Sequence, residues 1–167
     1  MDNDVLGEKA AVSVFYTHDH DQLDGFFKEF QASKHLDYPM AKGFFKQFKF
    51  GLQRHILWEE EILFPCFENK TGLVDSGPTW VMREEHRQIE AVLELLHQKV
   101  RRADPASDEE ESLLSSILAE HNRKEEEVLY PALDRLTSPE EKQAIFAGME
   151  SLPEAQYKTC GCQCHHG

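Results

Sequence analysis

The fold is decided by a fourteen-residue phrase that the chain carries twice: HILWEEEILFPCFE at residues 55–68 and HNRKEEEVLYPALD at residues 121–134. In each copy a histidine is followed four residues later by a glutamate, and then by a similar apolar run that ends in proline. A soluble helix does not need a histidine and a glutamate at this spacing in two places. A metal site does need them.

The spacing places each histidine and its glutamate on one face of a helix. Residues four apart on an α-helix are neighbours, with Cβ atoms roughly 5–6 Å apart. Steps of three and four connect His55 and Glu59, and likewise His121 and Glu125, to apolar residues of the same helices: Phe48, Leu52, Ile62 and Cys66 in the first, and Leu114, Ile117, Leu118 and Val128 in the second. We therefore expect both pairs to face the core and to reach one metal centre.

The rest of the chain also reads as helices, with almost no strand signal. Apolar periodicity predicts a first helix from Thr17 or Asp19, a second from Pro39 and a third after Pro78. Ser107 and Glu110 have the spacing of a capping box that opens a fourth helix. The segment 138–141, SPEE, opens a short fifth helix that is expected to end near residue 148. The prediction is an all-α fold, an antiparallel up-down-up-down four-helix bundle with a short extra C-terminal helix.

A chain of 167 residues is long enough for one domain with a sizeable core. We assign residues 1–153 to the bundle and residues 154–167 to a flexible tail rich in cysteine and histidine. The tail contains CGCQCHH at 160–166, whose thiols and imidazoles could bind a soft metal, deliver iron or form a redox switch. The alternative is a disordered end in which Cys160, Cys162 and Cys164 have no role.

The first and third helices each offer one histidine on their apolar side. His20 leads into the apolar positions of the first helix, whereas His18 leads into polar ones and should face water. His86 lies within the apolar stripe of the third helix, and Glu90 follows one turn later on its flank. A lone histidine in such a stripe is usually a hydrogen-bonded core residue, but here every long helix points one inward.

The inward glutamates Glu59 and Glu125 require positive charge nearby. An unpaired carboxylate that leaves water costs several kcal/mol, on the order of the penalty for any buried ion. No inward lysine or arginine is evident at these depths. One or two metal ions would supply the charge. Imidazole and carboxylate ligands suit iron, zinc or manganese, and bridging carboxylates favour a pair of ions.

Other residues of the repeated phrase are given a structural interpretation. Four further glutamates are expected on a solvated face: Glu60, Glu61, Glu126 and Glu127. The prolines are expected to bend or end their helices: Pro65 and Pro131. Three aromatic residues are interpreted as packing, although the first of them could also support a ligand: Tyr16, Phe64 and Tyr130.

Composition excludes several classes of function. A net charge of −13 argues against nucleic acid and against anionic membranes as partners. No apolar run approaches membrane-spanning length, and the N-terminus lacks the layout of a secretory signal, so we expect a cytoplasmic location. Three of the four cysteines crowd the C-terminus, which is no disulfide framework.

The ordered set of residues resembles the hemerythrin/HHE cation-binding family over about residues 15–135: a histidine, His-x-x-x-Glu, a histidine and a second His-x-x-x-Glu on successive helices. The resemblance implies an antiparallel four-helix bundle with an oxo- or hydroxo-bridged di-iron centre. Iron is favoured over zinc or manganese. Transferred to this chain, the resemblance implies that His20 and His55 ligate one iron, that His86 and His121 ligate the other, and that Glu59 and Glu125 bridge them.

The chain departs from the oxygen-carrying members of this family at two places. Those members have a second histidine four residues after the third-helix histidine, where this chain has Glu90. They also end with His-x-x-x-x-Asp, where this chain has His121 and Glu125 at the shorter spacing. Glu90 as a ligand would favour Fe(III) and lower the potential; off the metal, it would leave a second position open. Either outcome favours redox chemistry or sensing over reversible O₂ carriage.

The resulting prediction is a hemerythrin-like non-heme di-iron protein that binds O₂, peroxide or nitric oxide, with redox turnover left open. The alternative is a non-catalytic iron or oxygen sensor that signals through a protein partner. A third interpretation is a plain helical bundle that binds zinc adventitiously.

Overall fold

The structure is a computed structural model that describes residues 11–154 and 156. Every regular element in those residues is helical, which confirms the all-α prediction. The α-helices are α2 (Val12–Ser33), α3 (Tyr38–Trp58), α4 (Phe64–Thr71), α5 (Pro78–Arg101), α6 (Asp108–Lys124), α7 (Tyr130–Leu136) and α8 (Pro139–Ser151). Two π-helical segments, η1 (Glu59–Leu63) and η2 (Glu125–Leu129), join α3 to α4 and α6 to α7.

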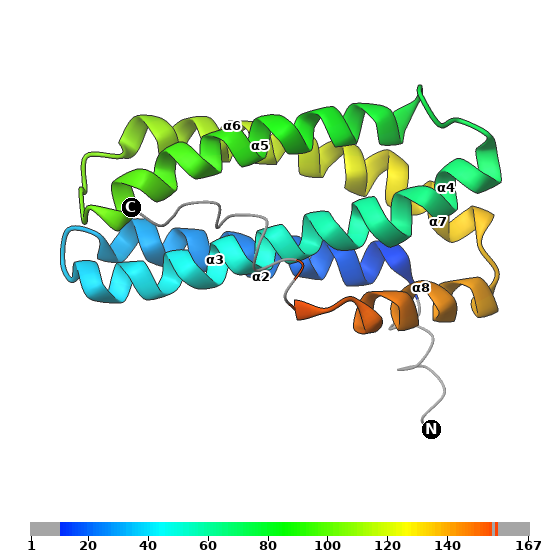
Figure 1. Cartoon of the computed structure of the whole chain (residues 1–167), viewed down its shortest axis with the longest axis horizontal. Helices are drawn as coiled ribbons and strands as arrows, with labels where there is room; N and C mark the ends of the chain where they lie inside the picture. The colour runs from blue at the N-terminus through cyan, green and yellow to red at the C-terminus, as the bar shows by residue number, and fades with distance from the viewer. Residues whose placement is uncertain (1–10, 155, 157–167) are drawn as a thin grey trace.

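Four long helical segments lie lengthwise beside one another (Figure 1). Helix α2 packs along α3, and α5 packs along α6. The α3–η1–α4 and α6–η2–α7 segments are the two copies of the repeated phrase with the helices that precede them. Helix α8 packs against η1 at one end of the molecule. No helix in residues 11–154 is both long and apolar enough to cross a membrane.

Local sequence signals explain most helix boundaries. The Asp37 side chain caps α3, and Pro78 is the first residue of α5 as predicted. At α8, Ser138 and Glu141 form a capping box, and the helix ends at Ser151, three residues later than expected. Helix α4 ends at Gly72, whose φ of 75° is the left-handed conformation that glycine adopts without strain.

One predicted helix start and one predicted cap are wrong, because distant residues replace the local signals. Helix α2 begins at Val12 rather than at Thr17 or Asp19, since the Asp134 carboxylate accepts hydrogen bonds from the backbone N–H groups of Val12 and Ser13. This cap comes from α7.

At α6, Ser107 is the N-cap residue, but the capping box with Glu110 does not form. The Ser107 hydroxyl instead donates to Glu111. That carboxylate also binds the buried Lys34 of α2, so a tertiary ion pair replaces the predicted local cap.

The π-helical segments change which residues face the core. The prolines do not end the helical path, because a π turn precedes each of them. The N–H of Phe64 donates a hydrogen bond to the carbonyl of Glu59, and the N–H of Tyr130 donates one to the carbonyl of Glu125. The extra residue in each π turn rotates the residues after it about the helix axis. Consequently the predicted inward Val128 is exposed, and Ile62 and Cys66 are only partly buried. The buried positions are four, five and eight residues after each glutamate: Leu63, Phe64 and Phe67, and Leu129, Tyr130 and Leu133.

The core has two clusters with the repeated histidines and glutamates between them. One cluster fills the end of the molecule at which α2 joins α3, and its aromatic members are Phe27, Phe30, Phe45 and Phe48. The other cluster packs α4, α7 and α8 around the start of α2. The proposed tail, including Cys160, Cys162 and Cys164, lies outside the described residues apart from positions 154 and 156.

Candidate metal centre

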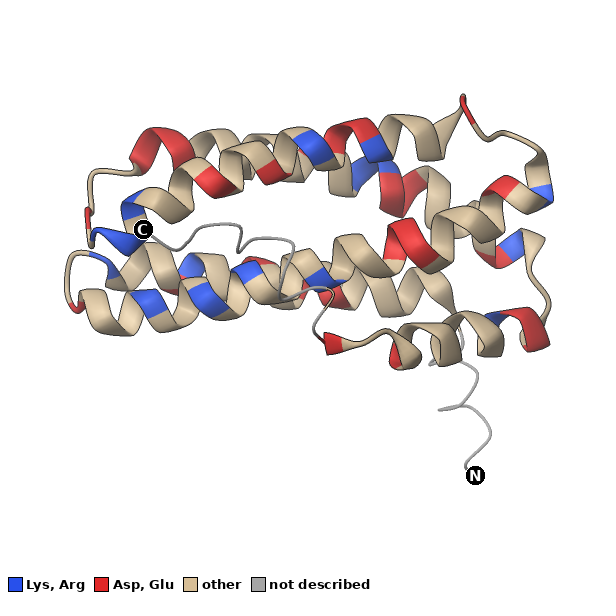
Figure 2. Ribbon diagram, viewed as in Figure 1, with Lys and Arg blue, Asp and Glu red and all other residues tan. Residues whose placement is uncertain are grey.

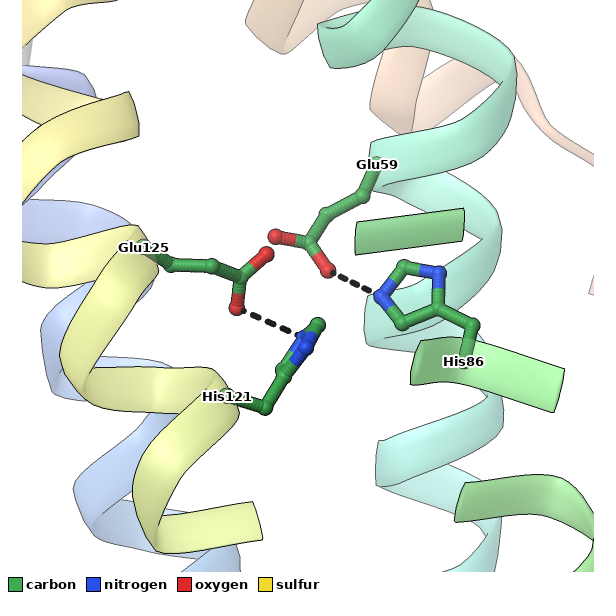
Figure 3. A group of neighbouring side chains, drawn as sticks. All are labelled: Glu59, His86, His121 and Glu125. Atoms are coloured by element: carbon green, nitrogen blue, oxygen red, sulfur yellow. Dashed lines mark ion pairs between the residues drawn. The ribbon is translucent and has the colours of Figure 1, made fainter. Parts of the chain in front are cut away.

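Six of the seven residues predicted as metal ligands converge in the middle of the molecule. Two overlapping groups bring ligand atoms within 4.8 Å of one another, and both groups are fully buried: Glu59, His86, His121 and Glu125; and His20, His55 and Glu125. The rings pair off, with centroids 4.6 Å apart for His20 and His55 and 4.8 Å apart for His86 and His121. In Figure 3 the two glutamates point toward each other from opposite helical segments.

Each glutamate lies between two histidines from different ring pairs. Oε1 of Glu59 is 3.5 Å from Nε2 of His55 and 3.2 Å from Nε2 of His86. Oε1 of Glu125 is 3.3 Å from Nε2 of His20 and 3.1 Å from Nε2 of His121. All four histidines therefore turn the same ring nitrogen toward the carboxylates. This is the arrangement that two bridging carboxylates between two ions require.

Several of these inward atoms have no hydrogen-bond partner. They are buried and lie at ion-pair distances without hydrogen-bond geometry: Oε1 of Glu59, both carboxylate oxygens of Glu125, and Nε2 of His86. Buried polar atoms are nearly always hydrogen-bonded, so each exception needs a cause. Donor atoms that face one another around a shared point fit a metal ion, whose bonds would satisfy them. The chemistry of the donor set thus suits the cation that the sequence predicted.

The electrostatics of the centre favour positive charge. Burial alone would lower the pKa of His55, but the charge of Glu59 and the hydrogen bond with Asp19 outweigh it and raise the pKa to about 10. For His86, burial is likewise outweighed by Glu59 and Glu60, and the pKa is about 9. Burial would raise the pKa of Glu59, yet His55 holds it well below its usual value. The carboxylates draw in positive charge, whether as protons on the imidazoles or as a metal ion.

A ring of outer carboxylates supports the histidines. Nδ1 of each histidine faces an acid from a neighbouring helical segment: His55 faces Asp19 at 2.8 Å, His121 faces Glu85 at 2.9 Å, His20 faces Glu126 at 2.9 Å, and His86 faces Glu60 at 3.6 Å. The first three are hydrogen bonds and the last is an ion-pair distance. A carboxylate partner keeps the proton on Nδ1, fixes the ring and leaves the Nε2 lone pair for a metal.

The outer acids are functional residues that sequence reasoning missed or misplaced. Glu60 and Glu126 are half-buried behind histidines rather than on a solvated face, while Glu61 and Glu127 are exposed or nearly so. Asp19 and Glu85 were not singled out. A signal was present, because each outer acid is adjacent in sequence to an inward residue. Neighbours on a helix lie about 100° apart, so an acid beside an inward ligand points at the next helix.

The two copies of the phrase differ at one position within the centre. Tyr130 is buried, and its hydroxyl donates to Oε2 of Glu59 at 2.7 Å and lies 3.3 Å from Nε2 of both His20 and His55. Tyr130 packs in the core as predicted, but its hydroxyl also contacts the centre, which the packing interpretation did not include. Phe64, at the matching position, stacks on His86 with ring centroids 5.6 Å apart, which is packing as predicted.

The structure also gives the positions of Tyr16, Glu90 and His18 relative to the centre. The Tyr16 hydroxyl donates to the sulfur of Met149 at 3.3 Å, and its ring packs edge-on against His55, so it belongs to the core. Glu90 lies outside both groups of ligand atoms, and its residue is exposed. Partial burial, and then the charge of Glu60, raise the pKa of the Glu90 carboxyl. His18 faces water as expected.

Comparison with known proteins gives the class of this fold and site. The family described as the hemerythrin HHE cation-binding domain matches residues 12–133. The match runs from the first residue of α2 into α7 and includes all six buried donor residues. The chain therefore belongs to the hemerythrin HHE cation-binding family. No curated protein and no solved structure matched the chain.

Proposed function

We propose that the protein is a hemerythrin-like di-iron protein that binds O₂ or a related small oxidant. The four long helical segments form an antiparallel up-down-up-down bundle, and α8 is an extra helix outside it. His20 and His55 would hold one iron, and His86 and His121 would hold the other. Glu59 and Glu125 would bridge the two ions. The donor set of four imidazoles and two carboxylates suits iron, zinc or manganese, and the preference for iron rests on the membership of the hemerythrin HHE family.

The observation that carries the proposal is the set of inward donor atoms without hydrogen bonds. Four histidines present Nε2 to two buried carboxylates, and acids on the outside hold three of the rings by hydrogen bonds at Nδ1. No lysine or arginine is among the ion-pair partners of Glu59 or Glu125 in residues 11–154. A plain bundle has no reason to assemble this much unneutralised acid in its core.

When bound, a pair of iron ions supplies a binding position for a small oxidant and the electrons to reduce it. The protein supplies positioning and a proton. Burial, then the charges of Glu125 and Glu59, hold the pKa of the Tyr130 phenol well above 10, so the phenol keeps its proton at neutral pH. Its hydroxyl lies between His20, His55 and Glu59, where it can donate to a ligand in the centre. Glu90 stays off the metal and leaves a position open there.

A groove lies beside the centre on one side. It lies between α2 and α6, has a volume of about 470 Å³, and His20 and Glu126 are among the residues that line it. The groove would admit a diatomic molecule or peroxide. Polar and charged side chains such as Asp21, Asn122 and Arg123 line it, which favours small polar oxidants over apolar substrates.

Metal analysis with an absorption spectrum of the aerobically purified protein tests the proposal. We expect about two irons per chain, as bridging carboxylate pairs hold, and an oxo-to-iron charge-transfer band that changes on reduction and on exposure to O₂, peroxide or nitric oxide. A colourless zinc protein would overturn the proposal. Glu90→His, which restores the histidine of the oxygen carriers, should then alter the potential or the O₂ reactivity; no change would show that position 90 does not reach the metal.

The second candidate is an iron or oxygen sensor, and the same groove favours it. Helix α2 packs closely on α3 and α5 on α6, whereas a groove separates α2 from α6. The metal centre would then hold the two helical pairs together, and a partner protein would recognise the loosened form. A sensor should lose protease resistance along α2 and α6 when iron is withdrawn, while an enzyme should show turnover with an intact fold.

A further inference from the structure

A second pocket lies between α3 and α5 and belongs to no part of the metal centre. It has a volume of about 650 Å³, and none of the six ligand residues lines it. It extends along α3 from Lys42 to Gln53 and along α5 from His97 to Arg101. Pockets of a few hundred to about 1,000 Å³ with an apolar floor and a few polar groups are typical small-molecule sites.

The pocket is positively charged in a strongly acidic protein. Lys42, Lys46, Lys49 and Arg101 line it, and no aspartate or glutamate does, although the whole chain has a net charge of −13. Figure 2 shows the basic bands along α3 and at the end of α5. Lys46 and Lys49 have no ion-pair partner among the residues that the structure describes. Their charge is available to a ligand.

The floor of the pocket is apolar and aromatic. Phe45, Phe50 and Val100 contribute to it, and the His97 ring stacks on Phe45 with centroids 6.1 Å apart. Nδ1 of His97 is buried without a hydrogen bond, although Oε2 of Glu94 lies 3.5 Å away.

The positive side chains of the pocket affect the pKa of His97. Burial first, and then the charge of Lys49 with a smaller effect of Arg101, lower the pKa of His97, against the opposing charge of Glu94. Lys49 and Arg101 thus lower the pKa of His97 as a positive pocket should, although burial is the larger cause and Glu94 opposes them. An anion that entered the pocket would offset the charges of these two residues.

We propose that this pocket binds a small amphipathic organic anion, a molecule with an acidic head group and an apolar body. Lys46 and Lys49 receive the head group, and Phe45, Phe50 and Val100 contact the body. Charge complementarity selects the anion. The aromatic floor favours such a ligand over inorganic phosphate or sulfate, because those ions have no apolar body to cover the floor and would leave it exposed to water. The site is independent of the metals bound at the centre.

A fluorescence titration of the full chain with 8-anilinonaphthalene-1-sulfonate tests the proposal, because this probe is itself an amphipathic anion. Competition with decanoate and with decyl phosphate identifies the preferred head group, and decanol is the neutral control. We expect saturable binding that one or both anions displace and decanol does not. Displacement by decanol at the same concentration would overturn the proposal, as would the absence of saturable binding.

A matched pair of variants locates the site. Lys46→Glu changes an exposed lysine of α3 in the pocket, and Lys28→Glu makes the same charge change at an exposed lysine of α2 outside it. We expect about tenfold weaker binding for Lys46→Glu and less than about twofold for Lys28→Glu, since only a charge within a few ångströms of the head group is weakly screened. Circular dichroism and metal content verify that both variants fold. Equal effects of the two variants would overturn the proposal.

Discussion

Two regions of this molecule bury carboxylates, and they neutralise them in opposite ways. Near the α5–α6 turn, the buried Glu111 bonds to the buried Lys34 and to the Ser107 hydroxyl. At the centre, Glu59 and Glu125 are fully buried and face histidines, one tyrosine and each other (Figure 3), with no lysine or arginine among their described ion-pair partners. In the first region the chain supplies its own cation. In the second region the described part of the chain supplies no lysine or arginine, and a bound metal cation would neutralise the carboxylates.

The two regions also differ in backbone geometry. Around Lys34 and the phenylalanine cluster, α2, α3 and α5 are uninterrupted α-helices. At the centre, both glutamates begin π-helical segments of five residues. π turns are rare and are frequently found at functional sites. Both copies have one, and in both it begins at the inward glutamate and lies shortly before the proline.

The largest expected effect on stability comes from breaking the Lys34–Glu111 ion pair. Lys34→Met should lower the free energy of unfolding by about 3–5 kcal/mol, because it leaves Glu111 buried without its cation. Metal content should not change. Urea unfolding with metal analysis measures both. The double variant Lys34→Met, Glu111→Leu should recover much of the loss; a double variant no more stable than the single one would contradict this account.

Removal of metal should have the next largest effect on stability, and this effect should come from the centre alone. A ligand at about 100 times its dissociation constant stabilises the folded state by about 3 kcal/mol. For a chain of this size that corresponds to a fall in melting temperature on the order of 10 °C. Calorimetry before and after chelation measures it. The same fall in a Glu125→Gln variant would mean that the metal does not bind at this carboxylate.

The outer carboxylates give a smaller effect on metal affinity. Glu85→Gln should weaken metal binding about 10- to 100-fold, because His121 loses the partner that orients its ring. Glu84→Gln is the matched control, since Glu84 pairs with Arg87 at the surface. Competition with a chromophoric chelator measures both affinities. If the two variants bind metal equally well, the ring of outer acids has no role in ligation.

Tyr130→Phe should cost about 1 kcal/mol of stability, the usual net value of one hydrogen bond, and should leave metal content unchanged. The reaction with peroxide should slow, because Glu59 and the centre lose their only phenolic donor among the described residues. Stopped-flow absorption measures the rate. Loss of iron in this variant would identify Tyr130 as a ligand instead of a proton donor.

The smallest expected effect is on the titration of His97, in the pocket between α3 and α5. Burial, Lys49 and Arg101 lower the pKa of His97 against Glu94, so the unfolded chain binds protons more readily there. Its contribution to stability is therefore present above the ordinary histidine pKa of about 6.5 and falls as the pH drops below it. NMR titration should give an apparent pKa for His97 below the ordinary histidine value of about 6.5. A value above it would contradict the positive charge in the pocket.

Prediction from sequence succeeded where the signal was local or periodic. The steps of three and four identified the six inward donor residues, and they converge in the structure. Prolines predicted the starts of α3 and α5 to within a residue, and the SPEE segment predicted the start of α8. The outer acids were missed because periodicity distinguishes inward from outward positions but does not show which outward residue touches the next helix.

The sequence by itself determined the helical class, the family and the six inward donor residues, because these depend on side-chain spacing along single helices and on the order of the motifs in the chain. Only the tertiary structure decided the rest. Asp134 caps α2 across the fold, the π turns bring Tyr130 against Glu59, and four outer acids face histidines of neighbouring segments. These features depend on how helices far apart in the chain meet, and that geometry is set by packing, which no local spacing encodes.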